Sequence, residues 1–159
     1  KEFLFDGFEG RSFSVPDGVQ EIGAFGFANS ELESITLPNS LQKIDECAFY
    51  KCSKLKRVVI PDGVLEIGKS AFLLCTSLEE VVIPESVKKL ADDAFCRCSS
   101  LESVRIPGGT ELVAGHEWIS NTNFQRDHSG ESGFTRIITP KNSPAARYAK
   151  ECSLPLTEE

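Results

Sequence analysis

The side chains of this chain that could carry chemistry are its cysteines and histidines. His116 and His128 have Glu117 and Asp127 beside them, and together these residues could form a metal site or a hydrolase-like site. The histidines lie 12 positions apart (128 − 116 = 12), however, and no close pair such as HxxxH is present. Zinc sites need closely defined ligand geometry. We therefore expect surface histidines, no metal site and no cofactor, and keep a site on the loop of residues 125–133 as an alternative.

The six cysteines do not form a zinc-binding pattern. Cys96 and Cys98 form a C-x-C pair, whereas a zinc ribbon requires two C-x-x-C knuckles. Cys52, Cys75 and Cys98 instead recur every 23 residues (75 − 52 = 23; 98 − 75 = 23). Buried cysteine behaves as a small apolar residue. We therefore expect these three in a buried column and all six as free thiols, with Cys96 directed elsewhere by alternation.

No catalytic residue can be assigned from the sequence. It contains no G-x-S-x-G nucleophile motif, and the glycines of "IPGGTE" at 106–111 lead into no P-loop lysine. Most carboxylates recur at positions expected on a solvated surface, and none forms an evident general acid–base pair. We expect a protein that is not an enzyme.

The elements that must position these residues repeat along the chain. A proline follows a short apolar segment at five places, 22 or 23 residues apart (38 − 16 = 22; 61 − 38 = 23). Fixed periods of roughly 20–50 residues indicate stacked repeats. Before four of the prolines stands the pattern L-x-x-I-x-I-P, for example "LESITLP" at 32–38. Its alternation predicts a strand with Ile35 and Leu37 inward and Ser34 and Thr36 outward, which the proline ends. The five prolines are Pro16, Pro38, Pro61, Pro84 and Pro107.

The second half of each repeat contains V-x-x-I and then, in most copies, Ala–Phe. We expect V-x-x-I to form a second short strand or extended segment, and "AFxxC" to form one tight helical turn. Stacked coils would place equivalent residues in columns through the molecule. The aromatic column would be Phe27, Phe49, Phe72 and Phe95. A polar column would alternate in sign, which disfavours a slipped register; its members are Glu21, Lys43, Glu66 and Lys89.

This pattern resembles the BspA-type leucine-rich repeat, whose consensus is L-x-x-I-x-I-P-x-S-V-x-x-I-G-x-x-A-F-x-x-C. The match is specific over residues 38–107 and good over 10–37. The resemblance implies a right-handed leucine-rich-repeat solenoid of the α/β class, with a parallel β-sheet on one face, short helical turns and a C-terminal helical cap. It also implies a cell-surface or secreted bacterial protein that acts in adhesion and protein binding and has no catalytic motif.

Residues 1–159 form a single domain in this interpretation. Residues 1–15 form an N-terminal lid or partial coil, residues 16–107 four regular repeats, and residues 108–140 a fifth repeat. In the fifth repeat, Trp118 and Phe124 take the Phe and Leu positions, and residues 125–133 are inserted as a loop. Residues 141–159 form the cap, where Ser143 precedes a helix with Pro144 at its first position. Because the sequence contains no Met, we expect a mature or excised piece, and further upstream repeats are the alternative to the lid.

Composition excludes two classes of partner. The formal net charge is −7 and the sequence pI is about 5.0, which argues against nucleic acid because binding to phosphates needs clustered Lys and Arg. No stretch approaches the ~18 consecutive apolar residues of a membrane-spanning helix, so we expect no membrane insertion. The sequence carries no signal for oligomeric state.

The remaining prediction is a surface that binds protein. Val59 and Val82 fall on the solvent side of neighbouring strands and are surrounded by charge, which is a common composition for protein interfaces. We expect a protein partner, such as a host or matrix protein, and the alternative is a structural spacer within a larger surface protein. The candidate residues on the sheet face are Lys56, Arg57, Val59, Glu79, Glu80, Val82 and Arg105. Those on the loop are Arg126, Asp127 and His128.

Overall fold

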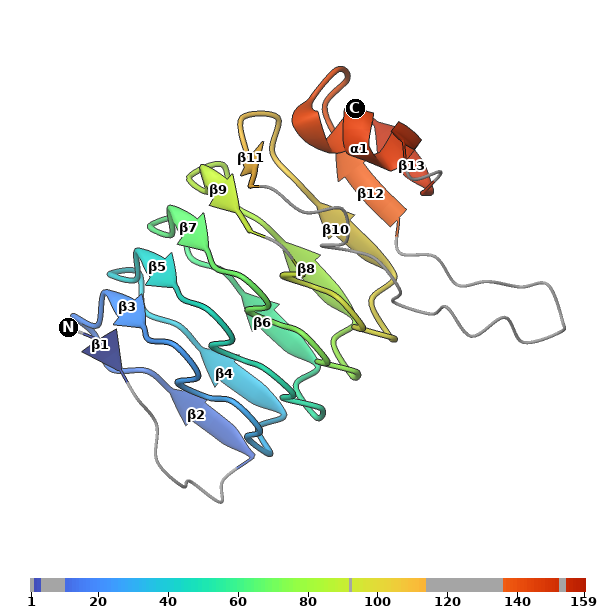
Figure 1. Cartoon of the computed structure of the whole chain (residues 1–159). Helices are drawn as coiled ribbons and strands as arrows, with labels where there is room; N and C mark the ends of the chain where they lie inside the picture. The colour runs from blue at the N-terminus through green and yellow to red at the C-terminus, as the bar shows by residue number, and fades with distance from the viewer. Residues whose placement is uncertain (1, 4–10, 92, 114–135, 152–153) are drawn as a thin grey trace, which may run out of the picture.

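The computed structural model describes residues 2–3, 11–91, 93–113, 136–151 and 154–159, which form a solenoid of parallel strands (Figure 1). Successive coils add strands to two parallel sheets, which confirms the predicted solenoid. The seven-stranded sheet has the order β13 (Leu156–Glu158), β12 (Arg136–Thr139), β10 (Ser103–Arg105), β8 (Glu80–Val82), β6 (Arg57–Val59), β4 (Ser34–Thr36), β2 (Ser12–Ser14). The six-stranded sheet has the order β1 (Glu2–Phe3), β3 (Glu21–Ile22), β5 (Lys43–Ile44), β7 (Glu66–Ile67), β9 (Lys89–Leu90), β11 (Glu111–Leu112).

The strands follow the alternation of the sequence. In β4, Ile35 is buried between exposed Ser34 and Thr36, and β6 and β8 repeat this pattern. The last two residues of each V-x-x-I segment also form a short strand, and these strands belong to the six-stranded sheet. In this sheet the expected column of alternating charge is in register from β3 to β9, and Glu111 of β11 extends it.

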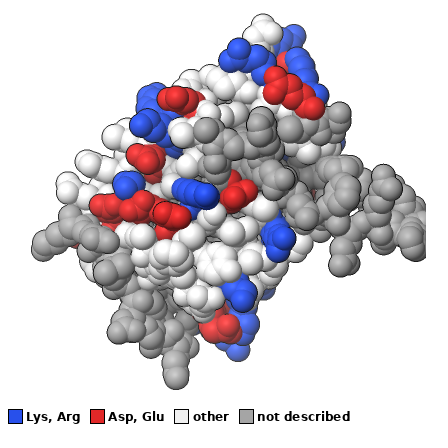
Figure 2. Space-filling view, in the orientation of Figure 1, with Lys and Arg blue, Asp and Glu red and all other residues white. Residues whose placement is uncertain are grey.

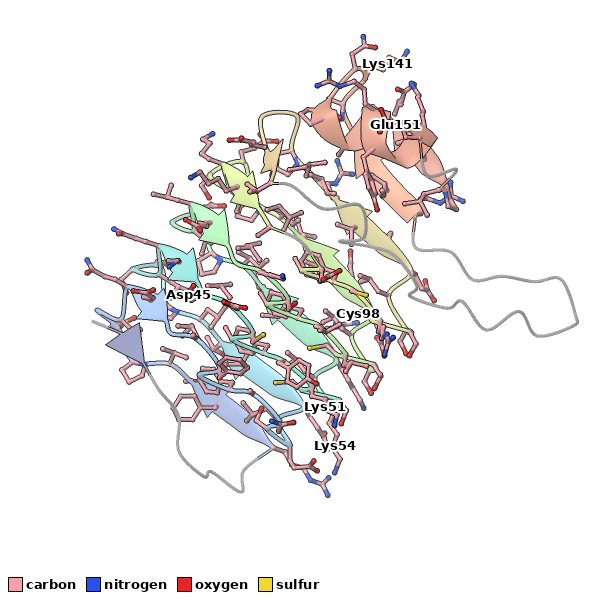
Figure 3. All side chains as sticks on the ribbon, in the orientation of Figure 1. Asp45, Lys51, Lys54, Cys98, Lys141 and Glu151 are labelled. Atoms are coloured by element: carbon pink, nitrogen blue, oxygen red, sulfur yellow. The ribbon has the colours of Figure 1, made fainter. Side chains whose placement is uncertain are left out.

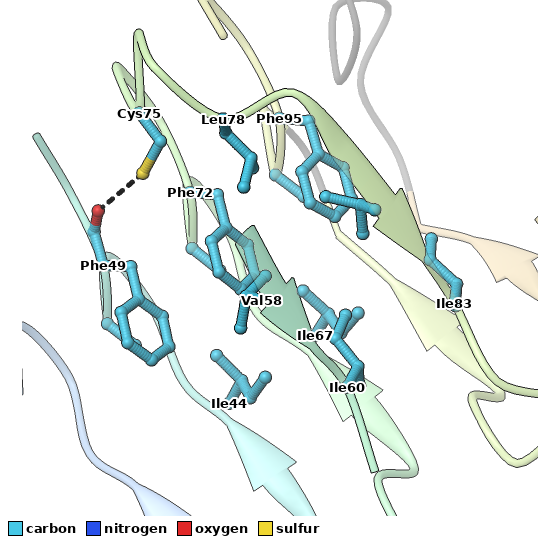
Figure 4. Close-up of a cluster of buried hydrophobic side chains, with 14 of the residues drawn as sticks. Ile44, Phe49, Val58, Ile60, Ile67, Phe72, Cys75, Leu78, Ile83 and Phe95 are labelled. Carbon is cyan, nitrogen blue, oxygen red and sulfur yellow. Dashed lines mark hydrogen bonds between the residues drawn. The ribbon is translucent and has the colours of Figure 1, made fainter. Parts of the chain in front are cut away.

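The core is a set of stacked columns of equal side chains. Phe27, Phe49, Phe72 and Phe95 are at most 1% exposed, and the centroids of successive rings lie 5.3, 5.0 and 5.2 Å apart. Neighbouring rings tilt by only 2–10°, so successive coils stack with little rotation. Figure 4 shows this aromatic file beside the inward-facing Ile and Val residues of the strands. The predicted aromatic column is confirmed.

The segment between Ala–Phe and the cysteine is not the helical turn that we expected. It forms consecutive hydrogen-bonded turns, in which Tyr50 N donates to Cys47 O (2.9 Å) and Cys52 N donates to Phe49 O (3.2 Å). Two residues per coil have positive φ, as Cys47 (55°) and Lys51 (60°) do in the second coil. This conformation turns the intervening N–H toward the next coil, so Phe49 N donates to Ala71 O (2.7 Å). The turns of neighbouring coils therefore form a third hydrogen-bonded ladder.

The C-terminal segment is a helical cap that also adds a strand. Helix α1 (Pro144–Glu151) begins after Ser143, whose Oγ accepts a hydrogen bond from Ala146 N (3.0 Å), and it buries three alanines against the last coil. This confirms the predicted cap. The chain then returns and pairs β13 in parallel with β12. We had expected "LPL" only to close the core, because nothing in it repeats the earlier strand pattern.

At the other end, β1 pairs in parallel with β3, and β2 pairs in parallel with β4. The inserted loop at 125–133 and the positions of Trp118, Phe124, His116, Glu117 and Cys152 lie outside the described residues, and so do the loop candidates Arg126, Asp127 and His128.

Candidate functional site: the outer face of the seven-stranded sheet

The seven candidate residues of the sheet face come from three adjacent coils and lie together. Arg57 and Val59 are on β6, Glu80 and Val82 are on β8, and Arg105 is on β10. Register pairs Arg57 with Glu80 and Val59 with Val82. Lys56 and Glu79 precede these strands, and all seven residues are exposed. We call the surface that these seven residues form the outer face.

Two neighbouring valines form the apolar part of the outer face. Val59 is 79% exposed and Val82 is 50% exposed, whereas Val58 and Val81 between the charged and apolar positions point into the core. The alternation of the strand causes this, because a buried Val58 requires its two neighbours to face solvent. The pair presents β-branched side chains on two strands that are each paired with a strand on both sides.

Four of the five charges of the outer face have no ionic partner within the described residues. Arg57 lies opposite Glu80, yet neither forms an ion pair there, and the same holds for Lys56 and Glu79. The six-stranded sheet differs, since Lys43 Nζ lies 3.3 Å from Glu21 and 3.1 Å from Asp45. Partial burial by itself would lower the pKa of Lys43, but the hydrogen bonds to both carboxylates outweigh it, and the pKa is raised.

Arg105 is the exception on the outer face, because Glu159 holds its guanidinium through both Nη atoms. Arg105 Nη2 lies 2.8 Å from Glu159 Oε1, and this carboxylate raises the pKa of Arg105 through hydrogen bonding and charge. Next to it, Arg136 Nη1 donates to Thr157 Oγ1 (3.2 Å). The contacts that depend on β13 could not be predicted, because residue spacing gives no indication that β13 joins the sheet.

The cysteine column is structural. Each Sγ donates to the carbonyl of the Phe in the preceding coil: Cys52 to Phe27 O (3.1 Å), Cys75 to Phe49 O (3.0 Å) and Cys98 to Phe72 O (3.1 Å). Figure 4 shows the second of these bonds. Burial raises the pKa of the Cys98 thiol to about 12 and that of Cys75 well above its usual value. Such thiols are protonated at neutral pH and are poor nucleophiles.

The five described cysteines are thiols and none is in a disulfide, as we expected. Cys98 lies inside the coil stack, as Figure 3 shows. Cys96 is also buried, at 8% exposure, which the alternation argument did not predict. The described residues contain no group of three or more His, Cys, Asp or Glu side chains that could hold a metal ion.

The charged surface is mixed in sign. Figure 2 shows acidic and basic side chains interspersed on the face in view, with no broad area of one sign. In the described part of the chain, no helix has the length and apolar character needed to cross a membrane.

Comparisons with known proteins give a consistent result. The BspA type leucine rich repeat region matches residues 1–125 in six copies. A leucine-rich repeat protein from Bacteroides ovatus is 33% identical with a TM-score of 0.68, over 83% of this chain and 32% of that one. The leucine-rich repeat protein of T. pallidum is 35% identical with a TM-score of 0.62, over 65% of this chain and 51% of that one. A leucine-rich cell surface protein from Faecalibacterium prausnitzii is 33% identical with a TM-score of 0.62, over 64% of this chain and 27% of that one.

No curated protein matches the chain. The chain spans between 27% and 51% of the length of these three solved proteins. The repeat match and the shared solenoid together show that this chain belongs to the BspA-type leucine-rich repeat family.

Proposed function

We propose that this chain is a non-enzymatic protein-binding module of a bacterial surface or secreted protein, and that it binds through the outer face. The observation that carries this proposal is the exposed pair Val59 and Val82 on adjacent strands, bordered by four charges that form no ion pair in the described part of the chain. Exposed apolar side chains surrounded by charge provide both area to bury and groups that select a partner.

The surface location is supported by the relatives. One solved relative is described as a leucine-rich cell surface protein, and the repeat family is shown for this chain. A module displayed on a cell binds proteins of its surroundings, so the partner class is an exposed protein such as a component of host matrix.

Binding to a panel of purified matrix proteins, including collagen, laminin and fibronectin, tests the proposal. The double variant Val59→Asp/Val82→Asp should lose at least tenfold in affinity for any member that the natural chain binds, because it places two carboxylates in the apolar centre. Leu65→Asp is the matched control, since Leu65 is 51% exposed away from the outer face. Circular dichroism establishes that the variants are folded.

Two results would contradict the proposal. If the natural chain binds no member of the panel, the solenoid is better explained as a spacer in a longer protein. If both variants bind as the natural chain does, binding takes place elsewhere, and the loop with Arg126, Asp127 and His128 becomes the next candidate. Metal analysis of the purified protein separately tests a metal or hydrolase-like site there.

A further inference from the structure

The charges of the outer face are arranged with opposite signs on the two sides of one line. The line runs between β6 and β8, parallel to the strands. Lys56, Arg57 and Val59 lie on the β6 side, and Glu79, Glu80 and Val82 lie on the β8 side. Across this line, register places Arg57 directly opposite Glu80 and Val59 directly opposite Val82.

Such a surface is complementary to itself. If a second copy is rotated by 180° about an axis along this line and placed face to face, β6 of one copy lies over β8 of the other. Arg57 then meets the other copy's Glu80, Lys56 meets Glu79, and Val59 packs on Val82, each contact occurring twice. This is the isologous geometry of a two-fold dimer.

The surroundings of the patch fit the same arrangement. One strand farther out, Ser34 of β4 lies over Ser103 of β10, so two small polar side chains meet. Thr36 lies over Arg105, whose charge Glu159 already neutralises. One like-charged pair results at the border, Glu33 over Glu102, but Glu33 already has an ionic partner in Arg11 (3.5 Å).

The face is also flat enough to meet its copy. Strands β4, β6, β8 and β10 run side by side in similar directions (Figure 1), and the phenylalanine rings of successive coils tilt by only 2–10°. In this arrangement the six strands from β2 to β12 can meet their counterparts, and at about 4.8 Å spacing and about 10 Å length they offer roughly 300 Å². This is well below the ~800 Å² per partner of stable complexes, so contact between two free chains should be weak. Display of many copies on one surface would strengthen it through multivalency.

We propose that the partner of the outer face is a second copy of this chain, so that the module makes a homophilic contact between the surfaces that carry it. The inference rests on the proposed function in one respect, namely that the outer face binds protein. It names which protein, and it gives ionic partners to four charges of one face that form no ion pair with any other described residue.

Charge reversal tests the geometry. Arg57→Glu alone places Glu over Glu at both equivalent contacts of a dimer, and Glu80→Arg alone places Arg over Arg. We expect sedimentation velocity, up to about 1 mM, to show self-association of the natural chain and at least tenfold weaker association of each variant. An equimolar mixture of the two variants restores every opposite-charge contact in the heterodimer, so mixing should recover the affinity.

Beads coated with the protein give a multivalent readout of the same contact. Beads with the natural chain should cluster, beads with either single variant should not, and a mixture of the two kinds should cluster again. Lys69→Glu is the matched control, because Lys69 is exposed away from the outer face and the charge change equals that of Arg57→Glu. It should cluster as the natural chain does.

Three results would overturn the inference: a natural chain that neither associates at about 1 mM nor clusters beads, single variants that associate as the natural chain does, or a mixture that fails to recover. Each is separable from the proposed function. A monomeric chain that binds a matrix protein through Val59 and Val82 keeps the proposed function and rejects the self-contact, and a chain that dimerises but binds no matrix protein does the reverse.

Discussion

At the scale of single residues, the fold depends on close approaches that only certain side chains permit. A Cβ on Gly68 would lie 2.7 Å from Asp45 C and from Glu46 N of the preceding coil, so the backbones are in direct contact there. A Cβ on Gly109 would meet nothing within 4 Å. These two glycines stand at different positions of the coil, seven residues after Pro61 (68 − 61 = 7) and two after Pro107 (109 − 107 = 2), and only Gly68 is required by a close approach of backbones.

Gly68→Ala should lower the free energy of unfolding by more than about 2 kcal/mol, because backbone atoms cannot yield to the added methyl group as a flexible side chain could. Gly109→Ala should leave stability unchanged or raise it by a few tenths to about 1 kcal/mol, since its φ is ordinary and the unfolded chain loses freedom. Urea titration of both variants measures this difference. Equal effects would show that the contact at Gly68 is not limiting.

The buried thiols make stability depend on pH in the alkaline range. Burial raises the pKa of Cys98 to about 12 from an ordinary value of 9.0. The folded chain therefore keeps the proton while the unfolded chain loses it, and the stabilising contribution is complete below pH 9 and is lost progressively between pH 9 and 12. The free energy of unfolding, measured in reducing buffer, should be lower at pH 10.5 than at pH 8.

Cys98→Ala provides the control for this dependence. It should lower stability at pH 8, because it removes the Sγ and its bond to Phe72 O, but it should reduce the loss between pH 8 and pH 10.5. The same alkaline slope in both proteins would assign the effect to other groups. Burial also raises the pKa of Cys75 and of Cys47, so these thiols contribute to the slope in the same direction, whereas the pKa of Cys52 is lowered by its hydrogen bond with Cys75.

At the scale of elements, the third ladder is the feature that distinguishes this coil from a plain pair of strands. It needs residues with positive φ at two positions per coil, and the chain uses Lys51, Leu74 and Arg97 at the second of them. An L-residue in this conformation costs about 1–2 kcal/mol relative to the right-handed region. Inter-coil bonds such as Lys51 N to Leu73 O (2.8 Å) offset that cost.

Lys51 allows this cost to be measured, because its side chain is exposed at the border of its coil (Figure 3). Lys51→Val should lower the free energy of unfolding by about 1–2 kcal/mol, since β-branched residues tolerate positive φ poorly. Lys51→Gly should be nearly neutral, because relief of strain and greater freedom of the unfolded chain oppose each other. Lys69→Val, at an exposed position without positive φ, should have a small effect. A neutral Lys51→Val would contradict the strain argument.

The elements that could be predicted are those in which residue types recur at a regular spacing in the sequence. Strict alternation fixed Ile35 inward and Val59 outward, and the 23-residue spacing placed Phe49 under Phe72, so the sheets and the core columns were predictable. The positive-φ turns were not, because Lys51 and Leu74 carry none of the usual glycine signal. The contact of Arg105 with Glu159 was not predictable either, since it depends on β13 joining the sheet after a helix that belongs to no repeat.

At the scale of the whole molecule, the repeat motif recurs in every coil, but two features of the surface recur only in every second coil. Charge in the six-stranded sheet alternates from Glu21 to Lys43 to Glu66 to Lys89. The turn after each proline alternates as well. Ser40 Oγ donates to Val19 O (2.8 Å) and Ser86 Oγ to Val64 O (2.7 Å), whereas glycines stand at the equivalent positions of the coils between and beside them.

The glycine that follows the coil of Ser40 has a steric reason. A Cβ on Gly63, which follows Ser40 by one coil, would lie 2.7 Å from Leu41 O and 2.8 Å from Asn39 O. The coil that carries Ser40 therefore leaves no room above it for any residue larger than glycine. The same limit does not apply one coil after Ser86, where a Cβ on Gly109 would meet nothing within 4 Å. Which coil can follow the coil of Ser40 is therefore restricted both by charge and by this local steric contact.

Deleting coils tests this two-coil period. Removal of residues 62–84, one coil, would stack Ser86 on Ser40 and place Lys89 opposite Lys43. Removal of residues 39–84, two coils, would stack Ser86 on Gly18 and place Lys89 opposite Glu21. In a solenoid whose stability is a sum of equal nearest-neighbour terms, the second deletion costs twice the first. We expect instead that the one-coil deletion loses more than half of the stability that the two-coil deletion loses, as measured by urea unfolding.

Ser86→Gly separates the steric part from the electrostatic part. In the intact chain this change should destabilise, because it removes the hydrogen bond to Val64 O. In the one-coil deletion it should stabilise, because it removes the Cβ that cannot fit above Ser40. Raising the salt concentration should then recover the remaining deficit in part, since the contact between Lys43 and Lys89 lies at the surface and is screened. A loss strictly proportional to the number of coils removed, with Ser86→Gly destabilising in both chains, would show that any coil can follow any other.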